Sequence, residues 1–92
     1  MTLLTEDQIS ARLGSVPGWE LHGDAIVTTV TRADFRDALL YVGAVAYLAE
    51  AANHHPDIAI SWNKVTLTLS THSAGGLTGA DFDQAERINQ LA

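Results

Sequence analysis

Residues 58–69 read Ile-Ala-Ile-Ser-Trp-Asn-Lys-Val-Thr-Leu-Thr-Leu, and this stretch decides the fold. Apolar side chains alternate with small or polar ones on both sides of Asn63-Lys64, as they do in strands that bury one face. The two residues between the alternating runs are typical of a tight turn. The stretch therefore predicts an antiparallel hairpin with strands at Ile58–Trp62 and Val65–Ser70.

A second pair of strands is predicted upstream. Trp19–His22 and Ala25–Thr31 have strand-like composition, and Gly23-Asp24 between them is a plausible hairpin turn. Pro17-Gly18 marks another turn just before the first of these strands. Short hairpins favour antiparallel pairing, so the two hairpins together predict a four-stranded antiparallel sheet.

Two short helices are predicted near the two ends of the chain. Thr5–Gln8 has the pattern of a capping box, and the helix that it begins should end at about Leu13. Thr78 is expected to cap the last helix, with Asp81 in the first turn, where the helix dipole favours a negative charge. The last helix presents one apolar stripe, which consists of Phe82, Ala85, Ile88 and Leu91.

The central helix is the longest predicted element. Apolar residues recur at steps of three and four from Phe35, and the helix can extend to Asn53, because Pro56 forbids its continuation. Either Thr31 or Asp34 could cap its start. Its apolar surface is wide, so one side is expected to pack on the sheet and another on a second subunit. The first stripe consists of Phe35, Leu39, Val42, Ala46 and Ala49, and the second of Ala38, Tyr41, Val45 and Leu48.

The order of the elements predicts the fold class. Helix, two strands, helix, two strands, helix indicates an α+β fold, a four-stranded antiparallel sheet with three helices packed on one face. The chain has 92 residues, so we expect a single domain over residues 1–92. The bare face of the sheet, or its edge, could serve a partner subunit.

The composition excludes several classes of function. Hydrophobic residues make up 47% and charged residues 17% of the chain, which is typical of a globular protein. The net charge is −6 with only five Lys and Arg, so no direct binding of nucleic acid is expected. The absence of cysteine excludes disulfides and thiolate metal sites. No stretch resembles a membrane span or a signal peptide, so we expect no membrane partner and a cytoplasmic location.

Histidine is the residue type that points to chemistry. His54 and His55 precede the predicted hairpin and His72 follows it, so the hairpin should bring all three to one end of the sheet. Glu50 lies four residues before His54, which on a helix puts both side chains on one face, where a carboxylate can fix the tautomer of an imidazole. Each feature taken singly is typical of an ordinary surface. Their convergence favours an acid–base site.

A metal site is an alternative interpretation of the same residues. Three histidines could bind zinc and leave a fourth position open. Adjacent histidines on a helix point roughly 100° apart, and the chain lacks the common His-x-His and His-x-x-x-His patterns. We therefore expect no metal, although the sequence alone leaves this open. Trp62 fits a core position and could alternatively stack on a flat ligand.

The chain resembles the pterin-4a-carbinolamine dehydratase family in the spacing of Glu50, His54-His55-Pro56, Trp62, His72 and Asp81. Residues 62–65 and 69–72 are similar to the central hairpin of that family, and residues 76–78 are similar to the segment before its last acidic residue. The resemblance covers nearly the whole chain, and its spacing is complete from residue 50 to residue 81.

The resemblance implies an enzyme, a dehydratase (lyase) of tetrahydrobiopterin biosynthesis or recycling. It implies that the enzyme removes water from 4a-hydroxytetrahydrobiopterin or a related pterin to give the quinonoid dihydropterin. It also implies a homodimer or homotetramer that needs no metal or organic cofactor. The alternative is a non-catalytic binding or assembly factor on the same fold, because some members of the family act as dimerisation cofactors of a transcription factor or assist enzyme assembly.

The resemblance also assigns roles to residues. It implies that His54 and His72 are the catalytic acid–base pair and that Glu50 supports His54. It does not assign which of the two histidines donates the proton to the leaving hydroxyl. The residues implied to bind the substrate are His55, Pro56, Thr71 and Ser73. Trp62 and Asp81 are implied to support the site, and the role of Asp81 can be helix capping alone.

Overall fold

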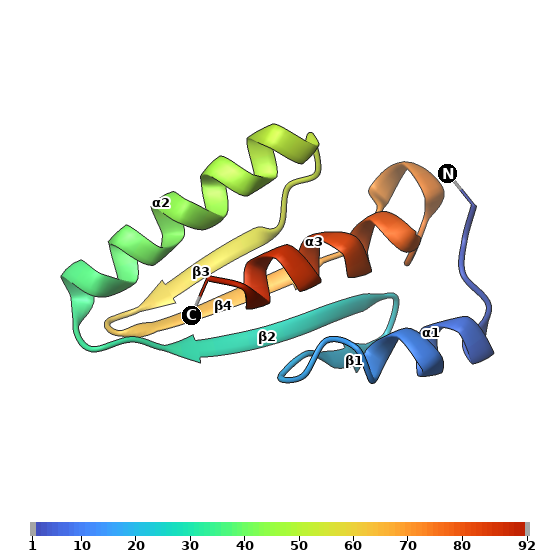
Figure 1. Ribbon diagram of the computed structural model, residues 1–92, viewed down its shortest axis with the longest axis horizontal. Helices are drawn as coiled ribbons and strands as arrows, with labels where there is room; N and C mark the ends of the chain where they lie inside the picture. The colour runs from blue at the N-terminus through green and yellow to red at the C-terminus, as the bar shows by residue number, and fades with distance from the viewer. Residues whose placement is uncertain (1, 92) are drawn as a thin grey trace.

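A computed structural model describes residues 2–91 of the chain, and it confirms the predicted α+β fold (Figure 1). The elements follow in the predicted order, with one short 3₁₀ helix added in the loop after the last strand. They are α1 (Glu6–Leu13), β1 (Glu20–His22), β2 (Ala25–Thr31), α2 (Phe35–Ala52), β3 (Asp57–Ser61), β4 (Lys64–Leu69), η1 (His72–Ala74) and α3 (Gly79–Asn89).

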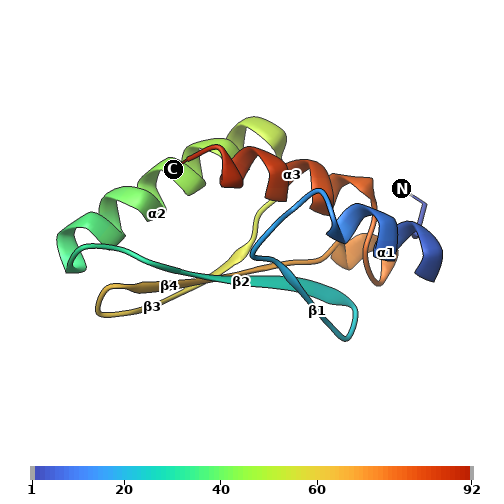
Figure 2. The ribbon, with the colours of Figure 1, turned by 60° about the horizontal axis from the view of Figure 1, so that its bottom comes forward.

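The four strands form one antiparallel sheet in the order β1-β2-β4-β3. The long central pairing joins β2 to β4, from Ile26 opposite Leu69 to Thr31 opposite Lys64. Figure 2 shows α1, α2 and α3 together on one side of the sheet and the other side bare. Within residues 2–91, none of the helices is long and apolar enough to cross a membrane.

Alternation along the strands divides the core from the bare face. Val65, Leu67 and Leu69 of β4 are fully buried towards the helices, as their spacing of two predicts. The residues between them face the other way, and there the hydroxyls of Thr29 and Thr66 lie 3.2 Å apart across neighbouring strands. The large side chains that complete the core include Trp19, Ile26, Tyr41, Leu77, Phe82 and Ile88.

The tip of the β3–β4 hairpin lies one residue earlier than predicted. Ser61 pairs with Lys64, so the turn residues are Trp62 and Asn63, and the expected Asn63-Lys64 turn is wrong. Trp62 adopts a positive φ of 51°, a conformation that is uncommon for a bulky residue. Its side chain is 67% exposed, so the predicted core position for Trp62 is also wrong.

The first strand is shorter than predicted. β1 begins at Glu20, whereas the sequence predicted a start at Trp19. Trp19 is instead buried just before the strand, and its indole N–H donates to the Asn89 side chain at 2.9 Å. The predicted capping box of Thr5 and Gln8 is confirmed, and α1 ends at Leu13 as expected.

The α2 helix buries the second of its two predicted apolar stripes. Ala38, Tyr41 and Val45 are buried, whereas Phe35 and Leu39 of the first stripe are half exposed. Ala49 is the buried member of the first stripe. Between the two expected N-caps, Asp34 is the one used, since its side chain accepts from the N–H of Asp37.

Arg32 ties the start of α2 to the hairpin tip. Its backbone exchanges hydrogen bonds with Asn63, and its guanidinium lies 4.9 Å from the Tyr41 ring and pairs with Asp37 at 3.1 Å. The Ala33 N–H and the Arg32 guanidinium hold the pKa of Asp37 below its usual value, whereas burial raises the pKa of Tyr41. The N-terminal end of α2 is therefore fixed over the tip of the hairpin.

Candidate active site

The register of the β3–β4 hairpin brings the histidine segments together. Asp57 at the start of β3 pairs with Thr68 near the end of β4. The residues that enter β3 and the residues that leave β4 therefore lie at the same end of the sheet, as the sequence predicted. His54 and His55 lie in the connection from α2, and His72 begins η1.

The imidazole of His54 contacts a buried carboxylate. Its Nε2 lies 2.6 Å from Oδ1 of Asp81, a residue with no exposed surface, and the His54 side chain is itself only 14% exposed. When the carboxylate is ionised it only accepts hydrogen bonds, and Nε2 is then the donor in this contact. The other ring nitrogen of His54, Nδ1, is then left to exchange a proton with a ligand.

Asp81 is held by its place at the start of α3. It is the third residue of the helix, and its Oδ2 accepts from the N–H of the N-cap Thr78 at 2.9 Å in a capping box. The same oxygen accepts from the Thr71 hydroxyl at 2.8 Å, and the two threonine hydroxyls lie 2.8 Å apart. These donors and the positive end of the helix dipole together account for a carboxylate in the interior. Asp81 thus contacts His54 in addition to capping α3.

Glu50 contacts His55 rather than His54. Oε2 of Glu50 lies 2.5 Å from Nε2 of His55, and both side chains are more than half exposed. The predicted pairing of Glu50 with His54 fails because α2 ends at Ala52 and Asn53 takes the left-handed conformation with φ 49°. The helical spacing on which the prediction rested therefore stops before it reaches His54.

The remaining predicted residues are divided between the two ends of the hairpin. Thr71, next to the exposed His72 and Ser73, belongs to the Asp81 network, and Pro56 is buried at the start of the hairpin. Trp62 lies at the hairpin tip, on the far side of the five residues of β3. At about 3.4 Å per residue this is roughly 17 Å from the histidines, so this chain does not bring Trp62 to its own site.

Gln84 is a residue at the site that the sequence prediction missed. It has no exposed surface, and its Nε2 donates to the backbone carbonyl of His54 at 3.3 Å. Gln84 stands between Phe82 and Ala85 of the predicted apolar stripe and three residues after Asp81. A polar residue on the buried side of a helix was the signal that could have identified it.

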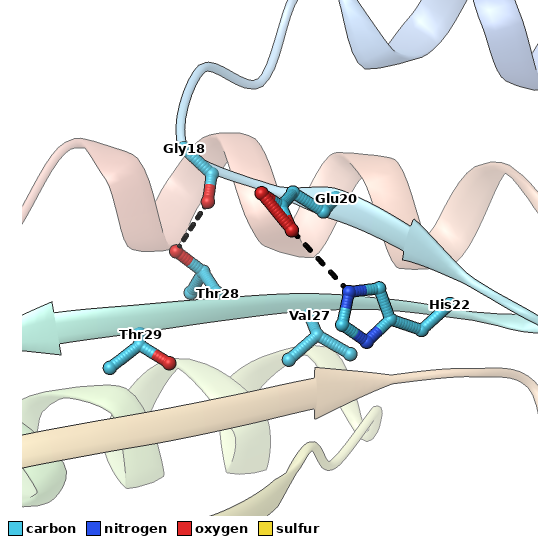
Figure 3. Close-up of a pocket in the computed structure, with 6 residues that line it drawn as sticks. All are labelled: Gly18, Glu20, His22, Val27, Thr28 and Thr29. Atoms are coloured by element: carbon cyan, nitrogen blue, oxygen red, sulfur yellow. Dashed lines mark hydrogen bonds and ion pairs between the residues drawn. The ribbon is translucent and has the colours of Figure 1, made fainter.

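A surface hollow of about 240 Å³ lies elsewhere, between β1 and β2 (Figure 3). None of the predicted site residues lines it. Its titratable members are Glu20 and His22, which are 3.4 Å apart and mostly exposed. Over residues 2–91, no three His, Asp or Glu side chains are grouped so as to hold a metal ion. The hollow is lined by Gly18, Glu20, His22, Val27, Thr28 and Thr29.

Comparison with known sequences identifies relatives over the whole chain. The family model described as pterin 4 alpha carbinolamine dehydratase matches residues 2–91. A relative in Roseiflexus castenholzii is 53% identical over 89 residues, which are 97% of this chain and 96% of the relative. One in Nocardia farcinica is 52% identical over 90 residues, 98% of this chain and 95% of the relative. Both are provisionally named pterin-4-alpha-carbinolamine dehydratases.

Two solved structures have similar folds. A transcriptional coactivator/pterin dehydratase from Brucella melitensis superposes with a TM-score of 0.93 at 33% identity, covering 99% of each chain. A pterin dehydratase-like protein, identified as a RuBisCO assembly factor in the alpha-carboxysome, superposes with a TM-score of 0.70. The second is 22% identical over 85% of this chain and 93% of the other, so that likeness concerns the fold alone.

Proposed function

Because this chain belongs to the pterin 4 alpha carbinolamine dehydratase family, we propose that it removes water from 4a-hydroxytetrahydrobiopterin or a related 4a-hydroxytetrahydropterin. The product is the quinonoid dihydropterin, and the reaction belongs to tetrahydrobiopterin biosynthesis or recycling. The observation that carries the proposal is the buried contact of His54 with Asp81, at the end of the sheet where His72 also lies.

The reaction needs two proton transfers. A proton joins the hydroxyl on C4a as the C–O bond breaks, and water leaves. The neighbouring ring nitrogen loses its proton, and the electron pair of that N–H bond forms the C=N bond of the product. Histidine suits both steps because its ordinary pKa of about 6.5 lies near neutral pH. A positioned acid or base contributes roughly 10²- to 10⁴-fold to such a rate.

His54 and His72 are proposed as the acid–base pair. Asp81 orients the His54 ring and fixes its tautomer, much as a carboxylate does for a catalytic histidine in other enzymes. The exposed imidazole of His72 follows Thr71, which donates to the same carboxylate. Either histidine can protonate the leaving hydroxyl, and the other then takes the proton from the ring nitrogen.

Substrate binding is proposed for the more exposed residues around this pair. His55, oriented by Glu50, and Ser73 lie at the surface, where a pterin can reach them, and the buried Pro56 shapes the chain beneath them. Thr71 is better suited to support Asp81 than to bind the pterin. Its hydroxyl, N–H and C=O are all engaged in hydrogen bonds within the chain.

The proposed activity is tested by following the dehydration of a synthetic 4a-hydroxytetrahydropterin by absorbance. The rates are compared with and without the purified protein, and with a chelator present. We expect an acceleration that survives the chelator. A well-folded protein that gives no acceleration would contradict the proposal, and an acceleration that the chelator abolishes would contradict the metal-free mechanism.

A second candidate function is that of a non-catalytic binding or assembly factor. The exposed apolar side chains of α2 favour it, because such a surface is suited to contact another protein chain. Leu40 and Tyr47 are 65% and 75% exposed, and Phe35 is 50% exposed. We propose that a second copy of the chain covers this surface in a homodimer or homotetramer in the cytoplasm, which analytical ultracentrifugation can test. The similar Brucella protein is described as a coactivator as well as a pterin dehydratase, which supports a binding role alongside dehydration as well as in place of it.

A further inference from the structure

The α3 helix presents two buried polar side chains to His54, one turn apart. Asp81 contacts the imidazole, and Gln84 donates from Nε2 to the backbone carbonyl of His54 at 3.3 Å. Neither Asp81 nor Gln84 has exposed surface. Residues three apart lie on the same face of a helix, so α3 holds His54 by its side chain and by its backbone at once.

The backbone of His54 is also held from the other side. Its N–H donates to the carbonyl of Ala49 in the last turn of α2 at 3.1 Å. The peptide units around His54 therefore connect α2 to α3, immediately after the left-handed residue Asn53. Without the Gln84 bond, the carbonyl of His54 would lose its connection to α3, and of the two hydrogen bonds that join His54 to α3 within residues 2–91, the Asp81 contact would remain.

Gln84 is a costly residue for this place in the interior. Its Oε1 is buried and has no hydrogen-bond partner among residues 2–91. Turning the amide over would set Oε1 against the carbonyl oxygen of His54, so the contact fixes the amide with its oxygen unpaired. An apolar side chain of similar length would avoid an unpaired buried acceptor. Stability therefore does not account for a glutamine at position 84.

We propose that Gln84 is a positioning residue for the acid–base chemistry of His54. It fixes the backbone at residue 54 so that the ring meets Asp81 in a productive orientation. This role leaves the Oε1 atom of Gln84 buried without a hydrogen bond from residues 2–91, which lowers stability. The inference rests on the proposed dehydratase function. It concerns a residue outside the spaced set of Glu50, His54, His55, His72 and Asp81.

The test is Gln84→Met, which keeps the length of the side chain and removes both the donor and the unpaired acceptor. We expect kcat to fall roughly tenfold or more, because a misplacement of about 1 Å at a reacting group can cost about 10²-fold. KM should stay within about twofold, since the buried Gln84 does not reach the substrate. The melting temperature should be equal or higher, and the pH titration of the His54 ring, followed by NMR, should shift.

Ile88→Val is the matched control on the same helix. It shortens a buried apolar side chain one turn further along α3, so it should lower the melting temperature and leave kcat and the His54 titration unchanged. Gln84→Leu serves as a second variant if the methionine does not fold. Because its side chain is also unable to donate, it should reproduce the same pattern.

The outcomes separate the positioning role from the proposed function. An active parent whose Gln84→Met variant keeps its kcat overturns the positioning role and leaves the dehydratase function standing. A loss of kcat without any shift in the His54 titration overturns it too. If the parent protein is inactive, the proposed function fails, and the His54 titration alone then decides whether Gln84 positions the ring.

Discussion

Asp81→Asn changes the charge beside His54 and almost nothing of the shape. In the structure Oδ2 of Asp81 accepts from the Thr78 N–H at 2.9 Å and from the Thr71 hydroxyl at 2.8 Å, and an amide oxygen can accept both bonds. The atom that faces Nε2 of His54 at 2.6 Å then becomes an NH₂ group, which can only donate. To keep a hydrogen bond, the imidazole has to accept at Nε2, so its proton moves to Nδ1.

The asparagine variant should lose much of its activity but little of its folding stability. A hydrogen bond to a charged group is worth about 1.5–3 kcal/mol and a neutral one about 0.5–1.5, so the exchange at His54 costs on the order of 1–2 kcal/mol. Loss of the charge at the helix start adds about 0.3–1 kcal/mol. The total is small beside the roughly 5–15 kcal/mol that hold a domain together, so the variant should fold. Turnover should fall about 10²- to 10⁴-fold, because the wrong tautomer removes one acid–base group.

The assay is the rate of pterin dehydration, measured beside urea unfolding and an NMR measurement of the His54 tautomer. Asp81→Ala is the contrasting variant. It removes all three bonds and leaves the Thr78 N–H without its carboxylate, so it should cost roughly 3–5 kcal/mol and confuse lost activity with lost structure. If Asp81→Asn turned over within about threefold of the parent, the role of the carboxylate in orienting His54 would be refuted.

Four further sets of variants test the other residues of the site and two features of the α2 helix. His54→Ala and His72→Ala should each lower turnover about 10²-fold or more with the fold retained, and a near-normal rate in either would remove that residue from the acid–base pair. Glu50→Ala should lower turnover less than either histidine variant and should raise KM more than it lowers kcat, because Glu50 contacts His55. A loss of turnover as large as that of His54→Ala in the same assay would mean that Glu50 has a direct catalytic role. Residue 53 has a φ of 49°, so Asn53→Ala should lower the free energy of unfolding by about 1 kcal/mol and Asn53→Gly should not. Equal stabilities of the alanine and glycine variants in urea unfolding would speak against this. The lowered pKa of Asp37 means that its contacts stabilise the fold above about pH 4 and are lost as the pH falls through the folded-state pKa. Asp37→Asn should therefore flatten the acid side of the stability–pH curve, and an unchanged curve would refute the assignment.

The sequence predicted the strands and helices because each carries its own period. In β4, Val65, Leu67 and Leu69 are spaced by two and all three are buried. The turn between β3 and β4 was predicted one residue too late. Asn63 is a residue type that favours turns, whereas nothing in the sequence indicates that Trp62 has a positive φ. Periodicity also could not choose between the two stripes of α2, since both repeat at helical spacing and only packing decides which faces the sheet.

The site could be predicted as a set of residues but not as a set of pairs. The antiparallel hairpin is a local feature, so the convergence of its two ends could be foreseen. The pairing of Glu50 depended on where α2 ends, and the αL residue Asn53 redirected the chain. The contacts of His54 with Asp81 and Gln84 join residues 27 and 30 apart across two elements, and no local pattern encodes such a contact.

One carboxylate joins the fold of this protein to its proposed chemistry. Asp81 caps α3 through Thr78 with one oxygen and meets His54 with the other. In a helix each residue is rotated by about 100° from the previous one, so a start of α3 shifted by one residue would turn Asp81 away from the imidazole. The contact of Asp81 with the imidazole therefore depends on a start of α3 at Gly79 and on the packing of α3 against the connection after α2. Changes that loosen the helix start, such as loss of the Thr78 cap, should then lower activity before they unfold the domain.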